Sequence, residues 1–428
     1  MKYMRVFQTL LAFSGNAPPQ LALTRELVDR GHEVRVLAHR AARERIERTG
    51  AEFVEYRRAL PDLDITRPET DSVRDWEART QLGASKRLRD AVIAPMPDGT
   101  RDVIELLDGW NADVVVFDWL IPAAAIAAEL VGVPAVALVH CPYPLPARGA
   151  PPLFSGLKPM AGPLGAARDR LLDSVTRRFS AAGLPVLNRV RAEHGLAPLE
   201  EWDDQLLGVR AIYVMTAPEL DFSSKSQLPA NVHYVGPAFE PFQKSWESPW
   251  PEENTDPLVL ISFSTSYMNQ GELAQRVLDA VAGLRIRALL TAGPALDTGH
   301  LRIPDNARSV AFIPHRTVLP HASLVITHAG WQTVNAALAD GVPLVCIPDG
   351  RDQPDNAARV LFVNAGVRAS KKSSPEKLRG VIARALEDQS IKQGARAMAD
   401  ALARSDGATV IADELERLPV SSTPVESD

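Results

Sequence analysis

Residues Ser323–Val360 read SLVITHAGWQTVNAALADGVPLVCIPDGRDQPDNAARV. The apolar run at the start is typical of a buried strand that ends at His328, and the following pattern predicts a helix that begins near Gln332 and stops at Gly341. A helix that starts at the carboxyl end of a strand offers free backbone N–H groups and the positive end of its dipole to an anion. We therefore predict an anion site on the backbone of residues 330–333, which are Gly330, Trp331, Gln332 and Thr333.

Side chains around this turn favour the same chemistry. Gly330 is expected to let the backbone approach a phosphate closely, and His328 and Thr333 add side-chain donors. The motifs G-x-G-x-x-G and G-x-x-x-x-G-K-[ST] do not occur in this stretch, which weakens the dinucleotide-oxidoreductase and P-loop NTPase interpretations. Asp352 and Gln353 follow the next strand, where they would bind a polyol or, alternatively, only cap the next helix.

Strands and helices alternate on both sides of this stretch. Val/Ile-rich strands joined by helices predict parallel sheets covered on both faces, and residues 234–257 have the Pro-, Trp- and charge-rich composition of a linker. We expect an α/β chain of two Rossmann-like, doubly wound domains at 1–236 and 258–418, with a linker at 237–257 and a disordered tail at 419–428. The predicted strands lie at 5–13, 34–38, 114–118, 134–140, 211–215, 257–265, 286–293, 309–314, 323–330 and 343–349, and the clearest predicted helices at 18–30, 123–132 and 272–283.

Composition excludes several classes of protein. The chain has 428 residues, of which 46% are hydrophobic and 23% charged, as in ordinary globular proteins. Its net charge of −6 gives no global basic field for nucleic acid. Cys141 and Cys346 make neither a disulfide framework nor a zinc site, which favours a reducing, cytoplasmic location. The longest apolar stretch, Pro122–Val139, contains Glu129 and Pro134, so we expect no membrane span.

Several motifs occur in order, each at a predicted strand end. They are H-x-G-x-x-T from His328, G-x-P from Gly341 and P-x-x-x-D-Q-x-x-N-A from Pro348, together with YVGPAF, VLISFSTS and FIPHRTVLPHA. In these motifs the chain resembles family-1, two-domain (GT-B) glycosyltransferases, above all their bacterial natural-product (antibiotic and macrolide) branch. The resemblance extends over nearly the whole chain and implies two Rossmann-like domains that face each other across a cleft.

The resemblance also implies roles for individual residues in binding a nucleotide-sugar. It implies that His328, Gly330, Gln332 and Thr333, with the Trp331 backbone, hold the pyrophosphate, that Ser264 and Thr265 face the phosphates, that Phe312 and Ile313 lie along the nucleobase, and that Asp352 and Gln353 bind sugar hydroxyls. Two positions depart from the family pattern: Ala336 stands where many relatives have Glu for the ribose, and Gln332 where many have a second Gly.

A third departure lies in the N-terminal domain. Relatives commonly read G-H-x-x-P after the first strand, and this His is the general base that deprotonates the acceptor. Here the segment is Gly15-Asn16-Ala17-Pro18-Pro19, so Asn16 stands in place of the base. An amide takes no proton near pH 7, and general-base assistance is worth roughly 10²–10⁴-fold. The carboxylate that orients the His in relatives is present as Asp118.

Four interpretations of this departure remain open. Asn16 caps the following helix, which excludes no function. Asp118, or His140 at the end of the predicted strand 134–140, serves as the base. The acceptor is an acidic phenol, an enol or an amine that needs little help. The protein binds a nucleotide-sugar without transferring it.

The resemblance thus implies an inverting glycosyltransferase, which we expect to move a sugar from a UDP- or TDP-sugar to a small apolar or aromatic acceptor. Trp76, Tyr143 and Phe154 line the acceptor pocket or merely pack in the core. We expect no cofactor and no metal, since no Asp-x-Asp stands at a strand end. The expected partners are the donor and the acceptor, with no nucleic acid and no membrane, and a homodimer is possible. The alternatives are a non-catalytic nucleotide-sugar-binding partner protein and a sugar-nucleotide epimerase.

Overall fold

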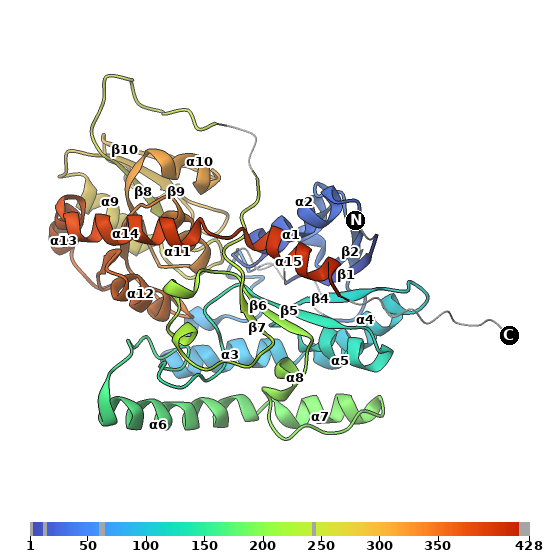
Figure 1. Cartoon of the computed structure of the whole chain (residues 1–428). Coiled ribbons are helices and arrows are strands. Elements are labelled where there is room, and N and C mark those ends of the chain that lie inside the picture. The colour runs from blue at the N-terminus through green and yellow to red at the C-terminus, as the bar shows by residue number, and fades with distance from the viewer. Residues whose placement is uncertain (1–2, 12–14, 60–64, 242–244, 419–428) are drawn as a thin grey trace.

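The computed structural model describes residues 3–11, 15–59, 65–241 and 245–418. These residues form two parallel sheets, each covered by helices on both faces (Figure 1). The seven-stranded N-terminal sheet has the order β3-β2-β1-β4-β5-β6-β7. Its strands are β1 Arg5–Thr9, β2 Glu33–Ala38, β3 Glu52–Glu55, β4 Val114–Asp118, β5 Ala135–Val139, β6 Ala211–Val214 and β7 Val232–Tyr234.

The six-stranded C-terminal sheet has the order β10-β9-β8-β11-β12-β13. In both sheets the order reverses next to the first strand, as in doubly wound folds. The predicted α/β class with two Rossmann-like domains is therefore confirmed. The strands of this second sheet are β8 Leu258–Ser262, β9 Arg287–Thr291, β10 Ala307–Val310, β11 Ala322–Thr327, β12 Leu344–Cys346 and β13 Gly366–Arg368.

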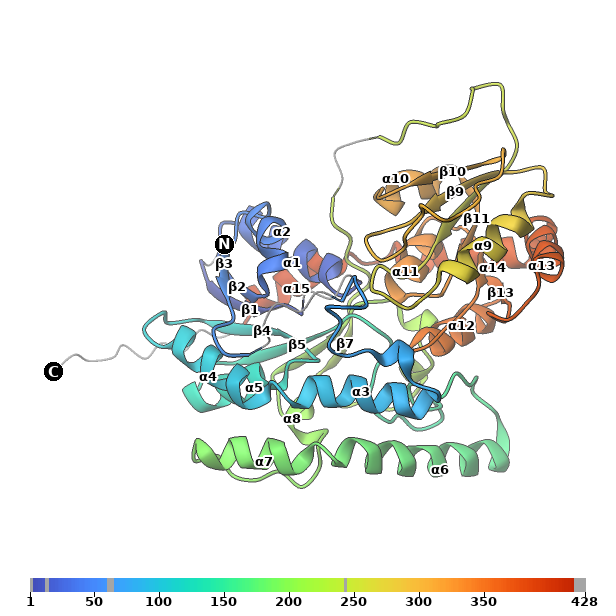
Figure 2. The ribbon, with the colours of Figure 1, turned by 180° about the vertical axis from the view of Figure 1, so that it is seen from behind.

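The helices connect successive strands. Those of the N-terminal half are α1 Ala17–Asp29, α2 Arg43–Glu47, α3 Gln81–Ile93, α4 Met96–Leu107, α5 Pro122–Val131, α6 Gly162–Ala181, α7 Leu184–Glu193 and α8 Asp204–Leu207. Those of the C-terminal half are α9 Gly271–Val281, α10 His315–Val318, α11 Trp331–Ala339, α12 Gln353–Phe362, α13 Pro375–Glu387, α14 Gln389–Leu402 and α15 Gly407–Glu416. Figure 2 shows α6 and α7 along the side of the N-terminal domain that faces away from the C-terminal sheet.

Some predicted strands have other bounds. The first, predicted at 5–13, ends at Thr9, and residues 12–13 lie outside the described residues. The strand predicted at 309–314 is β10, which ends at Val310, so Phe312 and Ile313 belong to the following loop. β3 and β7 were not predicted, because these short edge strands are only partly buried and lack a continuous apolar run. The predicted tail at 419–428 also lies outside the described residues.

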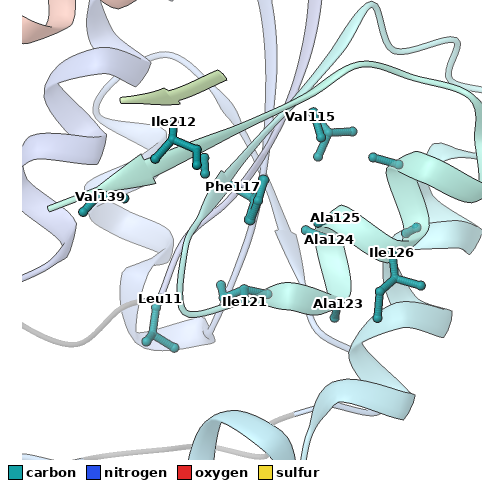
Figure 3. Packing of buried hydrophobic residues seen from close by; sticks show 14 of the residues in the cluster. Leu11, Val115, Phe117, Ile121, Ala123, Ala124, Ala125, Ile126, Val139 and Ile212 are labelled. Carbon is teal, nitrogen blue, oxygen red and sulfur yellow. The ribbon is translucent and has the colours of Figure 1, made fainter. Parts of the chain in front are cut away.

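The N-terminal core explains how β4 is held in place. Val115 and Phe117 of β4 are fully buried against Ile126 and the alanines of α5 (Figure 3). Alanine side chains let a helix approach a sheet closely, and such close packing leaves a strand little freedom to shift. The carboxyl end of β4, where Asp118 stands, is therefore a rigid position.

The last helix crosses back to the first domain. In α15, Ile411, Ala412 and Leu415 pack into the same cluster as residues of α1 and β1, and Arg30 Nη1 lies 2.6 Å from Asp413 Oδ1. Figure 1 shows α15 beside α1 accordingly. The predicted C-terminal range of 258–418 thus ends in a helix that packs on the N-terminal domain, because its apolar face matches the surface of α1.

Buried polar contacts join the two domains. Arg359 Nη2 of α12 lies 2.8 Å from Asp221 Oδ1, and both side chains are almost fully buried. The loop before α6 also reaches α12, where Gly156 N donates to Asp355 Oδ1 over 2.9 Å. Gly156 has a positive φ of 64°, and a Cβ there would lie 2.8 Å from Pro354 Cβ, so glycine is required.

Asp355 supplies a test of this contact. Burial raises the pKa of its carboxyl to about 6, from an ordinary value of 3.8. Because the folded state binds this proton more tightly than the unfolded state does, protonation of Asp355 stabilises the fold. This contribution is complete below pH 3.8 and is lost as the pH rises through 6. Asp355→Asn keeps an acceptor oxygen without the charge. We expect it to raise the free energy of unfolding at pH 7 by roughly 2–3 kcal/mol, in denaturant titrations.

The gain should shrink steadily between pH 7 and pH 4. The matched control is Asp400→Asn on the exposed face of α14, which should change the free energy of unfolding by less than about 0.5 kcal/mol. A pH-independent gain in Asp355→Asn would contradict the buried-carboxylate explanation.

Candidate active site

A cleft of about 800 Å³ lies between the two domains. It is bounded by the carboxyl ends of strands from both sheets, where ligands bind in open α/β folds. From the C-terminal domain it is lined by Ser264, Thr265, Phe312, Ile313, His328, Gly330, Trp331, Gln332, Thr333, Asp352 and Gln353. The structure therefore brings every C-terminal residue of the predicted donor site to one cavity.

In the turn from β11 to α11, the absence of a side chain at Gly330 makes room for another residue of the protein. Gly330 is the N-cap of α11 with an ordinary φ of −61°, and the left-handed residue is Ala329 with a φ of 70°. A Cβ on Gly330 would lie 2.6 Å from His328 Nε2. The missing side chain thus makes room for the imidazole, and His328 stands directly beside the helix N-terminus.

His328 is neutral at pH 7. Burial lowers the pKa of its imidazole to about 4, because the charged form would lose hydration. Its Nδ1 atom is buried and has no partner among the described residues. A buried ring nitrogen without a partner beside free helix amides is suited to meet a ligand.

The β8 loop and the β10 loop complete this side of the cleft. Ser264 N donates to Gln270 Oε1 over 2.9 Å, and the Ser264 and Ser266 hydroxyls lie 3.0 Å apart. Phe312 lines the cleft, and its ring is 74% exposed. Burial lowers the pKa of His315 to about 4, and its Nε2 lies 3.2 Å from Thr291 Oγ1.

Asp352 and Gln353, the predicted sugar-binding residues, have different hydrogen-bond partners. Gln353 Oε1 accepts hydrogen bonds from the backbone N–H groups of Asp349 and Gly350, so this amide chiefly holds its own loop. Asp352 Oδ2 accepts from Asn356 Nδ2 over 2.9 Å, whereas no described residue donates to its Oδ1. Asp352 is therefore the better placed of the two to bind a hydroxyl.

Asp118 and His140 form a buried pair on the N-terminal side. His140 Nε2 lies 3.2 Å from Asp118 Oδ1 and 3.1 Å from Oδ2. Asp118 also accepts from Leu120 N over 3.0 Å and from Gln20 Nε2 over 2.7 Å. A carboxylate only accepts, so the proton of neutral His140 sits on Nε2 and the lone pair on Nδ1.

The pair is oriented toward the cleft through its histidine. His140 lines the cavity, whereas Asp118 is fully buried behind it and does not line the described cavity. No described residue hydrogen-bonds to His140 Nδ1. Across the cleft, Gln332 Nε2 donates to the His140 carbonyl over 3.4 Å, so this histidine lies close to the N-terminus of α11.

Asn16 also lines the cleft, at the N-cap of α1. Its side chain makes no capping hydrogen bond, so the expected capping role is not seen in the structure. The Asn16 carbonyl instead accepts from Gln20 Nε2 over 3.1 Å. Gln20 thereby connects the start of α1 to Asp118.

Two of the three predicted acceptor residues lie elsewhere. Trp76 packs edge-on against Tyr267, and Tyr143 is buried in the core with its backbone N–H bonded to Asp221. Neither lines the described cavity, whereas Phe154 does. The prediction for Trp76 and Tyr143 is corrected accordingly, because each aromatic ring found a packing partner within the protein.

The individual residues of the apolar wall of the cleft were not predicted. The wall comes from α3 and α4, with contributions from the loop before α3, and consists of Ile65, Val73, Leu88, Ala91, Val92, Pro95 and Met96. The sequence signal was present, since Leu88, Val92 and Met96 recur every fourth residue, as on one face of a helix. This wall makes the N-terminal side suited to an apolar ligand.

No group of three or more His, Cys, Asp or Glu side chains in the described part of the chain is placed to hold a metal ion. Among the same residues, no helix combines the length and the apolar character needed to cross a bilayer.

Comparison with known proteins gives a consistent result. Residues 275–418 match the family model of the erythromycin biosynthesis protein CIII-like C-terminal domain. The chain is 29% identical over 422 residues to 4'-demethylrebeccamycin synthase of Lentzea aerocolonigenes, covering 97% of this chain and 99% of the relative. It is 27% identical to demethyllactenocin mycarosyltransferase of Streptomyces fradiae, over 96% and 85% of the two chains.

Among solved structures, the glycotransferase of kitacinnamycin superposes with a TM-score of 0.78 at 21% identity, covering 98% of this chain and all of the other. This likeness confirms the predicted GT-B fold. The relatives above identify the chain as a glycosyltransferase of the antibiotic-biosynthesis type, as the sequence motifs indicated.

Proposed function

We propose that this glycosyltransferase moves a sugar from a nucleotide diphosphate-sugar to a small apolar or aromatic acceptor, with inversion at the anomeric carbon. The observation that carries the proposal is the His140–Asp118 pair, which lies across the cleft from the N-terminus of α11. One side of the cleft offers a base and an apolar wall, and the other offers anion donors. An acceptor and a donor phosphate bound there would meet between the two.

In this proposal His140 is the general base. Its Nδ1 takes the proton of the acceptor hydroxyl while the acceptor oxygen attacks the anomeric carbon. Asp118 holds the Nε2–H tautomer and stabilises the imidazolium that forms, as carboxylates do in catalytic triads. His140 thereby takes over the work of the histidine that Asn16 replaces, although it comes from the end of β5 rather than from the start of α1.

The leaving group is the nucleoside diphosphate. As the bond from the anomeric carbon to the phosphate oxygen breaks, negative charge builds on the diphosphate. The free N–H groups at the start of α11, the Thr333 hydroxyl and neutral His328 donate to that charge. We propose that these groups suffice without a metal ion.

The nucleoside is proposed to be thymidine. Ala336 lies on α11 one turn beyond Gln332 and Thr333 and lines the cleft with a methyl group. A methyl group offers no hydrogen bond to a ribose 2'-hydroxyl, so binding a ribonucleoside would leave that hydroxyl without a side-chain partner from this position. A deoxyribose does not carry this cost.

The direct experiment is a transfer assay. TDP- and UDP-sugars are incubated with phenolic and macrolide acceptors, with and without EDTA, and products are read by mass spectrometry and by the anomeric NMR coupling. We expect transfer from TDP-sugars, inverted stereochemistry and no effect of EDTA. Donor left intact with every acceptor would favour a binding protein, and isomerised donor without acceptor would favour an epimerase.

The proposed base has its own test. His140→Gln removes the proton acceptor, and Asp118→Asn disturbs the tautomer, so each should lower kcat by roughly 10²–10⁴-fold. KM for the donor should change little, since neither side chain lies on the donor side of the cleft. Steady-state kinetics with a hydroxyl acceptor measures both constants.

Asn16→Ala serves as the comparison, because Asn16 lines the same cleft without contacting Asp118 through its side chain. Its kcat should stay within about tenfold of the wild type, since no proton transfer is lost. Wild-type rates in both His140→Gln and Asp118→Asn would reject this base and favour an intrinsically reactive acceptor.

The anion site predicts a steric effect at Gly330. In Gly330→Ala the new Cβ would displace the His328 imidazole from beside the helix N-terminus. Loss of one hydrogen bond to a charged group corresponds to about 1.5–3 kcal/mol, so Kd for TDP should rise at least about tenfold, as measured by calorimetry. The control is Gly271→Ala at the start of α9, where a Cβ meets no atom within 4 Å. Equal Kd values in both variants would speak against this diphosphate site.

A further inference from the structure

Arg351 has no part in the function proposed above, although it lines the donor side of the cleft. It stands between β12 and α12, directly before Asp352, with a left-handed φ of 54°. Its guanidinium crosses to the other domain. Nε and Nη2 donate to the two oxygens of Asp75 over 2.8 and 2.7 Å, and Nη1 donates to Ser266 Oγ over 2.6 Å.

Asp75 belongs to residues 65–77 of the N-terminal domain, here named the lid segment, which leads toward α3 (Figure 2). The lid segment contacts the C-terminal domain at two further points. Tyr267 N donates to Ile65 O over 2.7 Å, and the rings of Trp76 and Tyr267 meet edge-on with centroids 4.9 Å apart. Three separate contacts therefore fasten the lid segment to the donor domain.

The lid segment is stiffened from within. Asp71 Oδ1 accepts from the backbone N–H groups of Val73 and Arg74, and its Oδ2 accepts from Trp76 Nε1 over 3.1 Å. These hydrogen bonds hold residues 71–76 as one unit, so we expect a displacement of Asp75 to displace Trp76 as well.

The lid segment also forms a wall of the reaction space. Ile65, Asp71 and Val73 line the same cavity as Ser264 and Asp352. Ser266, which Arg351 contacts, has its hydroxyl 3.0 Å from that of Ser264. Arg351 thus links the lid segment with the loop that faces the phosphates in the proposed function.

We propose that Arg351 and Asp75 form a latch that holds the lid segment over the donor sugar, a role that rests on the proposed function. The latch excludes water, so that the acceptor rather than water takes the sugar. Both side chains are largely buried, at 22% and 2% exposure. Because Arg351 keeps 22% of its side chain exposed, its charge regains water when the pair opens, as each turnover requires. Arg351 and Asp75 are positioning residues.

The Tyr267 amide reports latch closure without any catalysis, because its acceptor lies in the other domain. Hydrogen–deuterium exchange of this amide is measured by NMR or by mass spectrometry with residue resolution, in the presence of TDP. Asp75→Asn and Arg351→Gln should speed its exchange at least about tenfold. The charge-swapped variant Asp75→Arg/Arg351→Asp should restore part of the protection.

Two further readouts separate a latch from a merely structural pair. In both single variants the ratio of donor hydrolysis to transfer should rise about tenfold, while Kd for TDP stays within about twofold, since neither residue is proposed to bind phosphate. Arg351→Lys keeps the charge but loses the two-pronged contact, so its values should fall between wild type and Arg351→Gln.

The matched control is Glu55→Gln. Glu55 makes a similar two-pronged pair with Arg40, but both residues belong to the N-terminal domain and neither lines the described cavity. It should change neither the exchange nor the ratio. Unchanged Tyr267 exchange in both latch variants would overturn the latch, whatever the transfer assay gives. Faster exchange with an unchanged hydrolysis ratio would overturn its role in water exclusion. A chain that transfers no sugar but still shows faster exchange would count against the proposed function alone.

Discussion

The contact between His140 and Asp118 depends on the register of two neighbouring parallel strands. β4 and β5 pair so that Asp118 lies beside Leu138. Successive side chains of a strand alternate between faces, so His140, two residues after Leu138, returns to the face that carries Asp118. That face is the one covered by α1, from which Gln20 reaches the same carboxylate. A slip of one residue would send His140 to the opposite face. The dense packing of Phe117 and Val115 against α5 opposes such a slip.

The two domains are joined differently on the two sides of the cleft. Away from the cavity, Arg359 and Asp221 are 3% and 0% exposed, and α15 returns to pack on α1. Separating these contacts would strip a buried charge of its partner, which costs several kcal/mol. At the cavity, the Arg351 side chain is 22% exposed, against 3% for Arg359, and no packed helix reinforces the contact that it makes with Asp75 as α15 does on the other side. The side with Arg359, Asp221 and α15 is therefore suited to act as a hinge, and the side with Arg351 and Asp75 is suited to open and close.

Sequence reasoning predicted a residue's place correctly where that place follows from a strand end. The carboxyl ends of parallel strands meet at one edge of their sheet. Once the strands are recognised, Asp118 and His140 are therefore expected at the edge of the N-terminal sheet, and Ser264 and His328 at the edge of the C-terminal sheet. It failed for Trp76 and Tyr143, because an aromatic ring in a loop packs on whatever partner the fold supplies, and Tyr267 and the buried core are distant in sequence. The contact of Arg351 with Asp75 joins residues 276 positions apart. No local pattern encodes such a pair, since it exists only when both domains are in place.

The replacement of the histidine seen in relatives by Asn16 can be understood by comparing how a side chain is held at residue 16 and at residue 140. A side chain at residue 16 is held by the first turn of α1, whereas His140 is held by the end of a buried strand and by two carboxylate contacts. Gln20 of α1 donates a hydrogen bond to Oδ2 of Asp118, and the His140 imidazole approaches the same carboxylate from the end of β5. With Asp118 already bonded by Gln20, Leu120 and His140, a second imidazole at residue 16 would compete for a carboxylate that has little capacity left. In the proposed function, Asn16 and His140 are therefore two parts of one arrangement, in which the base follows β5 and does not stand at the start of α1.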